Sequence, residues 1–456
     1  MELSQLIADQ RRFFHSGKTR SLAFRELMLD DLARKIREME PEIHAALASD
    51  LGKSAFESYM CETGMVLSEI RYMKRHFRKF AARQRVRTPL AQFPSRSYVL
   101  KEPYGCVLIM SPWNYPFMLT MEPLVDALAA GNTVILKPSA YSPATSAVIR
   151  SLVTQVFPRE LVAVVEGGRA ENQQLLEQQF DYIFFTGGTT VGKLVLQKAA
   201  QHFTPVTLEM GGKSPCIVDE TADLKVAARR IAFGKYLNCG QTCVAPDYLL
   251  IQRSVMESFL PLLYEAIKDM YGRDPLQNPN YGRIVNQRHF VRITEILDGE
   301  TVLYGGQRNQ DTLQIAPTVV GPVSLDGPAM GQELFAPILP VVPYDTLTQA
   351  VELVASRPKP LALYLFSRDR GTIRYVQEAL SYGGGCINDT IIHLATSEMG
   401  FGGVGMSGMG SYHGRRGFDT FTHEKSMVSK GCWLDLPMRY QKYTPWKGRL
   451  LRMFLR

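Results

Sequence analysis

A regular alternation of short apolar runs with helix-forming stretches, beginning near residue 104, constrains the fold of this chain most strongly. Four apolar runs fit buried strands: GCVLIM, TVILKPS, LVAVVEGG and YIFFTGG. Helical periodicity lies between the second and third of these runs, at 143–157, and after the fourth, from 190 onward. Strands that alternate with helices form parallel βαβ units. We therefore predict an α/β fold with a Rossmann-type domain, followed by a second α/β region.

The length of 456 residues is too great for one simple core. SYVLKEP (97–103) is typical of one arm of a β-ribbon, which we expect to serve oligomerisation. We expect the domains to pack tightly, because the sequence has neither an internal repeat nor a low-complexity linker. The expected division is 1–82 with 103–210 as the first α/β domain, 211–395 as the second, 83–102 with 396–430 as bridging arms and a loop, and 431–456 as a basic tail.

The charge balance indicates a solvated basic surface. Lys and Arg outnumber Asp and Glu by 52 to 44, which gives a net charge of +8. The basic residues cluster at 71–87 and 439–456, and neither cluster carries the motifs of a nucleic-acid module. We therefore expect no nucleic-acid partner, and anionic lipid or an acidic partner is the alternative.

The sequence favours a cytoplasmic protein. No apolar run approaches the ~20 residues that cross a bilayer, and the first twenty residues lack the apolar core of a secretory signal. Seven cysteines, an odd number, do not indicate a disulfide framework. The tail YTPWKGRLLRMFLR (443–456) interleaves apolar and basic residues, so it could pack at a dimer interface, fray, or lie on a membrane surface.

Two glycine-rich segments carry weak phosphate-binding signals. GGKSP (211–215) resembles the end of a P-loop, but the required first glycine is replaced by Thr207. FTGGTTVG (185–192) lies at a strand–helix junction, which suits a pyrophosphate at a helix N-terminus. It lacks the GxGxxG fingerprint, so a plain tight turn explains it equally well.

Three residues stand where covalent carbonyl chemistry would need them. Cys243, in NCGQTCVAPDY, lies on a loop where a thiol can be exposed as a nucleophile, although a buried inert cysteine is the alternative. Glu209 ends an apolar strand and could activate water, or form a salt bridge. Asn114 lies between two prolines, where its amide could stabilise an oxyanion or simply shape a turn. Cys239 has no further ligands nearby for zinc, so we assign it to packing and expect no metal site.

The order of several motifs resembles the aldehyde dehydrogenase superfamily, and the chain ending and VAPDY resemble its class 3 branch. The motifs are PWNYP (112–116), KPS (137–139), FTGG (185–188), LEMGGKSP (208–215), GQTC (240–243), ELF (333–335) and GFGGVGMSGMGSYHGRRGFDTFTHEKS (400–426). The resemblance implies NAD(P)-dependent oxidation of an aldehyde to its acid. Cys243 would form a thiohemiacetal and then a thioester, Asn114 would hold the oxyanion, and Glu209 would activate the hydrolytic water.

The resemblance implies that 1–82 with 103–210 bind NAD(P), that 211–395 form the catalytic domain and that 396–430 include an active-site loop. It also implies the residues that contact cofactor and substrate. Cofactor contacts would come from Lys137, Ser139, Gly187, Gly188, Gly192, Glu333 and Phe335, with Asn388 near the active site. An apolar entrance tunnel for a medium-to-long aliphatic or aromatic aldehyde would include Tyr115, Met118, Leu119, Ile391, Ile392, His393 and Leu394.

Departures from the family pattern bear on the cofactor. Ala140 follows KPS where the family usually has Glu, so the carboxylate that repels a 2′-phosphate is missing and we expect NADP to be accepted. Gly188 and Ala336 also depart from the pattern, because they replace a common Ser and a common Gly.

The class implies a homodimer. The alternatives are a CoA-acylating dehydrogenase, a cysteine hydrolase and a non-catalytic scaffold.

Overall fold

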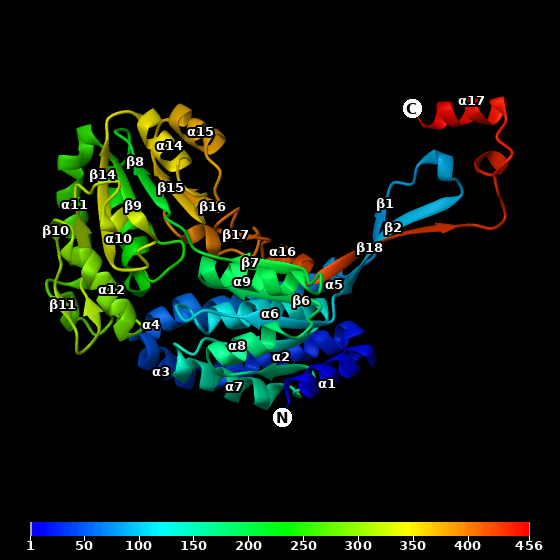
Figure 1. Cartoon of the computed structure of the whole chain (residues 1–456), viewed down its shortest axis with the longest axis horizontal. Coiled ribbons are helices and arrows are strands. Elements are labelled where there is room, and N and C mark those ends of the chain that lie inside the picture. Colours follow the sequence, from blue (N-terminus) through cyan, green and yellow to red (C-terminus); the bar gives the residue numbers. More distant parts are fainter. Residues whose placement is uncertain (1, 456) are drawn as a thin grey trace.

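The computed structural model describes residues 2–455, which form two α/β lobes and a projecting arm. The two lobes lie against each other, and the arm extends away from the first lobe (Figure 1). Among residues 2–455, no helix is both long and apolar enough to cross a membrane.

The first lobe is built on a six-stranded sheet, as the alternation of strands and helices predicts. Its neighbours are parallel except at β17, which runs antiparallel to β7. The strand order is β17 (Gly408–Met409), β7 (Val206–Glu209), β6 (Tyr182–Thr186), β3 (Cys106–Met110), β4 (Thr133–Lys137), β5 (Val162–Val164). All five residues of β3 and of β4 are buried, because a parallel sheet is covered by helices on both faces.

Helices cover this sheet on both sides. The crossover helices are α6 (Met118–Ala130), α7 (Pro143–Val156), α8 (Arg169–Leu176) and α9 (Thr189–Ala200). The N-terminal region packs against α6 and α7 and consists of α1 (Leu3–His15), α2 (Leu22–Glu38), α3 (Glu40–Leu51), α4 (Ala55–Ser58) and α5 (Gly64–Phe80). A π-helical turn, Tyr59–Thr63, joins α4 to α5.

The second lobe holds a seven-stranded sheet that is parallel except at its β10 edge. Its order is β10 (Val302–Tyr304), β13 (Thr318–Val320), β14 (Ile338–Tyr344), β9 (Tyr248–Gln252), β8 (Pro215–Val218), β15 (Ala362–Phe366), β16 (Gly384–Ile387). Its main helices are α10 (Leu224–Tyr236), α11 (Arg253–Tyr271), α12 (Gln287–Asp298), α14 (Leu347–Ala355) and α15 (Arg370–Ala379). The smaller elements are α13 (Pro328–Gly331) and the hairpin β11 (Arg308–Asn309) and β12 (Gln314–Ile315).

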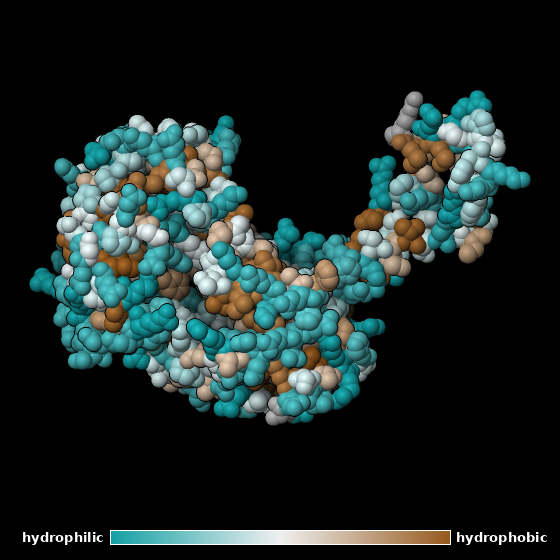
Figure 2. Space-filling view, in the orientation of Figure 1, coloured by the Kyte–Doolittle hydropathy of each residue, from teal (hydrophilic) through white to brown (hydrophobic). Residues whose placement is uncertain are grey.

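The arm is a three-stranded antiparallel sheet rather than a two-stranded ribbon. Its order is β1 (Gln84–Val86), β2 (Ser95–Pro103), β18 (Thr422–Lys430), and the chain ends beyond it in α17 (Pro445–Phe454). Strand β18 pairs with β2 over its full length, from Thr422 opposite Pro103 to Lys430 opposite Ser95. Figure 2 shows hydrophobic residues beside hydrophilic ones on this arm, which stands clear of both lobes.

Part of the segment expected in the arms lies in the first lobe. Strand β17 extends the first sheet, and α16 (Gly414–Thr420) packs against α5 and α6. The approach is close because Gly417 lacks a side chain: a Cβ there would lie 1.8 Å from Asp126 Oδ2. We therefore propose that the arm comprises only β1, β2, β18 and the tail, and the other domain boundaries remain as proposed.

Candidate active site

Two cavities meet at Cys243. One has a volume of about 190 Å³ and a largely apolar lining, and the other has a volume of about 270 Å³ and a more polar lining. Leu119, Cys243, Phe401 and Tyr412 line both. The thiol therefore has access to two separate binding spaces.

The loop that carries Cys243 follows an unusual turn after α10. Asn238 and Cys239 adopt positive φ angles of 51° and 53°, and Gly240 follows at 69°. Only glycine fits at 240, because a Cβ would lie 2.2 Å from the carbonyl oxygen of Ala336. Beyond this turn, Thr242 and Cys243 line the cavities. Cys239 itself is buried, as its assignment to packing predicts.

The surroundings of Cys243 favour the neutral thiol. Desolvation, together with the nearby carboxylates of Glu333 and Glu209, raises its pKa to about 12. The backbone N–H groups of Cys243 and Val244 act in the opposite direction and lower that pKa. Without a ligand, Cys243 is therefore a neutral thiol. A positive charge bound nearby would lower its pKa and favour the reactive thiolate.

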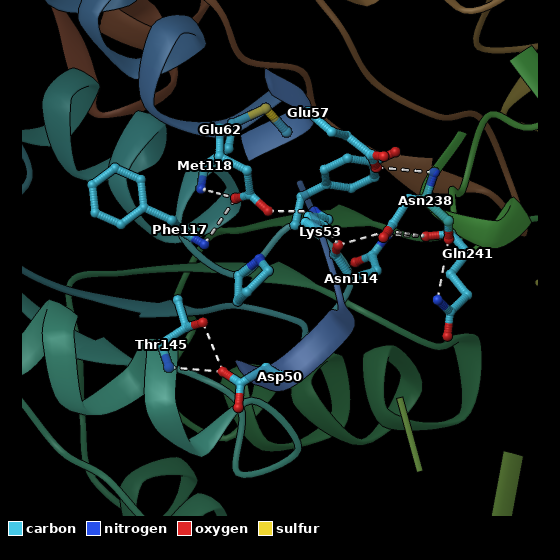
Figure 3. Close-up of polar contacts among 12 residues, drawn as sticks. Asp50, Lys53, Glu57, Glu62, Asn114, Phe117, Met118, Thr145, Asn238 and Gln241 are labelled. Carbon is cyan, nitrogen blue, oxygen red and sulfur yellow. Dashed lines mark hydrogen bonds and ion pairs between the residues drawn. The ribbon is translucent and has the colours of Figure 1, made fainter. Parts of the chain in front are cut away.

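Asn114 lies against the nucleophile loop. It follows β3 in the loop that leads into α6, and its Nδ2 donates a hydrogen bond of 3.0 Å to the carbonyl oxygen of Gln241. The main-chain carbonyl oxygen of Asn114 accepts hydrogen bonds from Lys53 Nζ at 2.9 Å and from Asn238 Nδ2 at 2.8 Å (Figure 3). One amide hydrogen is thus used to fix the side chain, and the second remains to donate beside Cys243.

Glu209, at the end of β7, is a buried carboxyl group that lines the more polar cavity. Neither of its oxygens has a hydrogen-bond partner within residues 2–455. Burial raises its pKa well above the ordinary value. A carboxyl group with free lone pairs and a high pKa is suited to take a proton from water.

The same cavity contains four of the seven residues expected to contact a cofactor: Gly187, Gly188, Glu333 and Phe335. Gly188 caps α9, and a Cβ there would meet nothing within 4 Å, so the N-terminus of this helix opens into free space. Unbonded N–H groups at a helix N-terminus attract phosphate.

The other three expected cofactor residues lie outside that cavity lining. Lys137 Nζ donates to the carbonyl oxygens of Pro138 and Gly167 at 2.8 and 2.7 Å. Ser139 Oγ accepts from the backbone of Tyr141, and a Cβ at Gly192 would press on Met210. Contacts within the protein therefore account for a lysine, a serine and a glycine at these three positions without a ligand.

Glu333 depends on a glycine that sequence reasoning did not single out. A Cβ at Gly211 would lie 2.3 Å from both carboxylate oxygens of Glu333, so Gly211 leaves the space that this side chain occupies. Burial and Asp247 raise the pKa of Glu333 to about 8. Phe335 has a φ of 50° and meets Trp113 edge to face at 5.3 Å.

The apolar cavity contains most of the expected tunnel residues. The residues that line it as expected are Tyr115, Met118, Leu119, Ile391, Ile392 and Leu394.

His393 is not among the lining residues. Its ring lies 6.0 Å from the rings of Tyr364 and Phe401, and its Nδ1 lies 3.6 Å from Cys386 Sγ. Asn388 instead bonds Ser367 with both ends of its amide. Sequence reasoning missed the contributions of Met60, Cys61, Met65, Phe233, Leu237, Thr242, Ala395 and His413.

The electrostatic coupling between Glu333 and Cys243 can be measured directly. Because the pKa of Glu333 is about 8, its negative charge is present above pH 8 and disfavours the thiolate. Glu333→Gln should therefore accelerate alkylation of Cys243 by iodoacetamide at pH 9 about three- to tenfold, as a pKa change of about half to one unit implies. Mass spectrometry of the peptide that contains Cys243 measures the rate, and exposed Glu378→Gln is the control. A Cys243 in Glu333→Gln that reacts no faster than in wild type would contradict the coupling.

Comparison with known proteins places this geometry in context. The model of the aldehyde dehydrogenase family matches residues 1–427. The chain is 46% identical to 4,4'-diaponeurosporen-aldehyde dehydrogenase of Staphylococcus aureus, covering 98% of this chain and 97% of the relative. It is 43% identical to the rat enzyme named aldehyde dehydrogenase, dimeric NADP-preferring, covering 99% of both chains.

A solved structure agrees closely with this fold. The substrate-bound state of Staphylococcus aureus AldH superposes with a TM-score of 0.98 at 44% identity, and the match covers 100% of both chains.

Proposed function

Since this chain belongs to the aldehyde dehydrogenase family and is an oxidoreductase acting on aldehydes, we propose that it forms the acid through a covalent thioester on Cys243. The meeting of two cavities at this thiol carries the proposal. The apolar cavity suits the aldehyde, and the polar one suits a dinucleotide. A simple cysteine hydrolase would not need the second space.

The chemistry follows from the three polar groups at the junction. Cys243 adds as a thiolate to the aldehyde carbon, and the oxygen that becomes negative accepts hydrogen bonds from Asn114 Nδ2 and the backbone N–H of Cys243. The polar cavity would hold the nicotinamide dinucleotide that supplies the hydride acceptor, and loss of hydride from that carbon would leave a thioester on Cys243. Glu209 then removes a proton from water as the water oxygen adds to the thioester, and the thiolate leaves.

The residues of the polar cavity fit a dinucleotide. The open N-terminus of α9 at Gly188 would hold the pyrophosphate, Glu333 would bind the nicotinamide ribose, and Phe335 would pack against the ring. Lys137 and Ser139, at the end of β4, would lie toward the adenosine ribose. A hydrolytic glutamate is not needed for transfer to CoA, so the placement of Glu209 favours acid as the product.

The assignment of Glu209 can be tested by separating acylation from hydrolysis. Glu209→Gln should still acylate Cys243 and release one burst of reduced cofactor per site, and steady turnover should fall at least about a hundredfold. Rapid-mixing absorbance measures the burst, and mass spectrometry detects the thioester. Cys243→Ser should give no burst. Undiminished steady turnover of Glu209→Gln would mean that another group is the base.

The lining of the apolar cavity supports a medium-to-long aliphatic or aromatic aldehyde. Burial of each methylene contributes about 0.8 kcal/mol, or roughly fourfold in kcat/KM, until the cavity is filled. We expect kcat/KM to rise in this way along a series of linear aldehydes, monitored by reduced-cofactor absorbance. A preference for a short semialdehyde that carries a carboxylate would contradict this substrate class.

The cofactor preference rests on Ala140, which is exposed in the turn after β4. No carboxylate stands there to repel a 2′-phosphate, so we propose that NADP is accepted as well as NAD. Ala140→Glu should shift the ratio of kcat/KM for NADP to that for NAD downward by about tenfold, as one charge–charge contact implies. Ala140→Gln keeps the size without the charge. An unchanged ratio in Ala140→Glu would refute the idea.

The arm supports a proposal about assembly. Strand β18 lies at the edge of its sheet, and seven of its nine residues are exposed, which leaves a backbone edge free to pair. We propose a homodimer that uses this arm, and the rat relative is named dimeric.

Helix α17 exposes Trp446 and Met453 beside basic residues, so this helix could pack at the dimer interface or make weak contact with anionic lipid. Co-sedimentation with anionic vesicles, with and without the tail, distinguishes the two.

A further inference from the structure

A buried ion pair lies directly beneath the loop that carries Asn114. Lys53 follows the end of α3, and Glu62 lies in the π-helical turn before α5. Their side chains are almost completely buried, and Lys53 Nζ lies 2.5 Å from Glu62 Oε1 (Figure 3). Neither residue lines the polar cavity or the apolar one.

The pair holds that loop at two points. Lys53 Nζ donates to the carbonyl oxygen of Asn114 at 2.9 Å. Glu62 Oε2 accepts from the backbone N–H groups of Phe117 and Met118 at 3.0 and 2.8 Å, at the start of α6. The first N–H groups of a helix have no partner within the helix, so the carboxylate caps α6 as well as neutralising the lysine. Figure 3 shows both contacts converging on the same short segment.

Further contacts tie the segment to the nucleophile loop. The Lys53 ammonium lies 4.0 Å from the centre of the Tyr115 ring, and the Tyr115 hydroxyl is 2.6 Å from Thr242 Oγ1, next to Cys243. Asn238 Nδ2 is the second donor to the Asn114 carbonyl, and its backbone N–H donates to Glu57 at 3.1 Å. The backbone position of Asn114 is therefore fixed from both sides.

Stability alone does not explain such a pair. Desolvation makes a buried ion pair about as stable as well-packed apolar residues of similar size, or less stable. Here each charged group directs its remaining hydrogen-bonding capacity at backbone atoms of the short segment that begins at Asn114 and ends at Met118. An oxyanion donor must be held within about half an ångström, and an error of about 1 Å can lower a rate ~100-fold.

We propose that Lys53 and Glu62 are positioning residues that hold the Asn114 amide where the oxyanion forms on the aldehyde bound to Cys243. The proposal rests on the oxyanion role of Asn114 given under the proposed function. Because Asn238 also holds the Asn114 carbonyl, loss of Lys53 displaces the amide rather than freeing it. The effect falls on kcat and leaves aldehyde and cofactor binding nearly intact, since the oxyanion exists only as the reaction proceeds.

The test uses the double variant Lys53→Met/Glu62→Gln, which keeps an acceptor for the α6 N–H groups and removes both charges of the pair together. We expect kcat to fall about ten- to hundredfold, with KM for the aldehyde and Kd for the cofactor within about twofold. The decisive comparison repeats the substitution in Asn114→Ala, where it should lower kcat by less than about twofold, because the amide it positions is gone.

Lys101→Met is the matched control. The Lys101 side chain is equally buried, but it pairs with Asp419 and Glu424 at the base of the arm and not with the Asn114 loop. It should lower the thermal midpoint without lowering kcat of the folded enzyme. This separates the loss of a buried lysine from the loss of the Asn114 contact.

Two outcomes overturn the inference. Wild-type kcat in the double variant, or an equal loss of kcat in the presence and absence of the Asn114 amide, would show a merely structural role. If Asn114→Ala itself retains wild-type kcat, the oxyanion assignment fails and this inference fails with it. An impaired Asn114→Ala beside an unimpaired double variant overturns the positioning role alone.

Discussion

The hydrogen bond from Asn114 Nδ2 to the carbonyl oxygen of Gln241 joins the two lobes at the point where the reaction is proposed to occur. The donor lies after a strand of the first sheet, and the acceptor lies two residues before Cys243 in the second lobe. The Tyr115–Thr242 hydrogen bond runs beside it. Because neither sheet alone holds both a carbonyl-stabilising amide and a thiol, the docking of the lobes assembles the site.

The electrostatics of the site favour neutral groups until a ligand enters. The pKa values of Cys243, Glu209 and Glu333 are all raised, chiefly because burial disfavours their charged forms. The carboxylates of Glu333 and Glu209 also disfavour ionisation of the Cys243 thiol. A positive charge bound in the polar cavity would lower all three pKa values together, so ligand binding and activation of the nucleophile are coupled by simple Coulombic attraction.

Local signals in the sequence predicted the first sheet well, because buried parallel strands leave apolar runs such as those at Cys106–Met110 and Tyr182–Thr186. The motifs around Asn114, Glu209 and Cys243 predicted that these residues share one site, and in the structure all three line the polar cavity. The sequence placed all of 396–430 in the arms and loop and did not separate β18 from β17 and α16, because β18 is largely exposed and so lacks the apolar alternation of a half-buried strand. His393 lies outside the apolar cavity although its neighbours line it, since the backbone turns sharply at Ile391.

The sequence by itself therefore determined the fold class and the family, and it proposed the reactive groups, because all three depend on residue type and short spacing. The tertiary structure alone showed which distant residues support them. Gly211 leaves space for Glu333, and Lys53 and Glu62 bind backbone atoms more than fifty positions later in the chain. Such contacts leave no periodic pattern in the sequence. The sequence does not distinguish a buried lysine from an exposed one, because burial depends on how distant segments pack around the side chain.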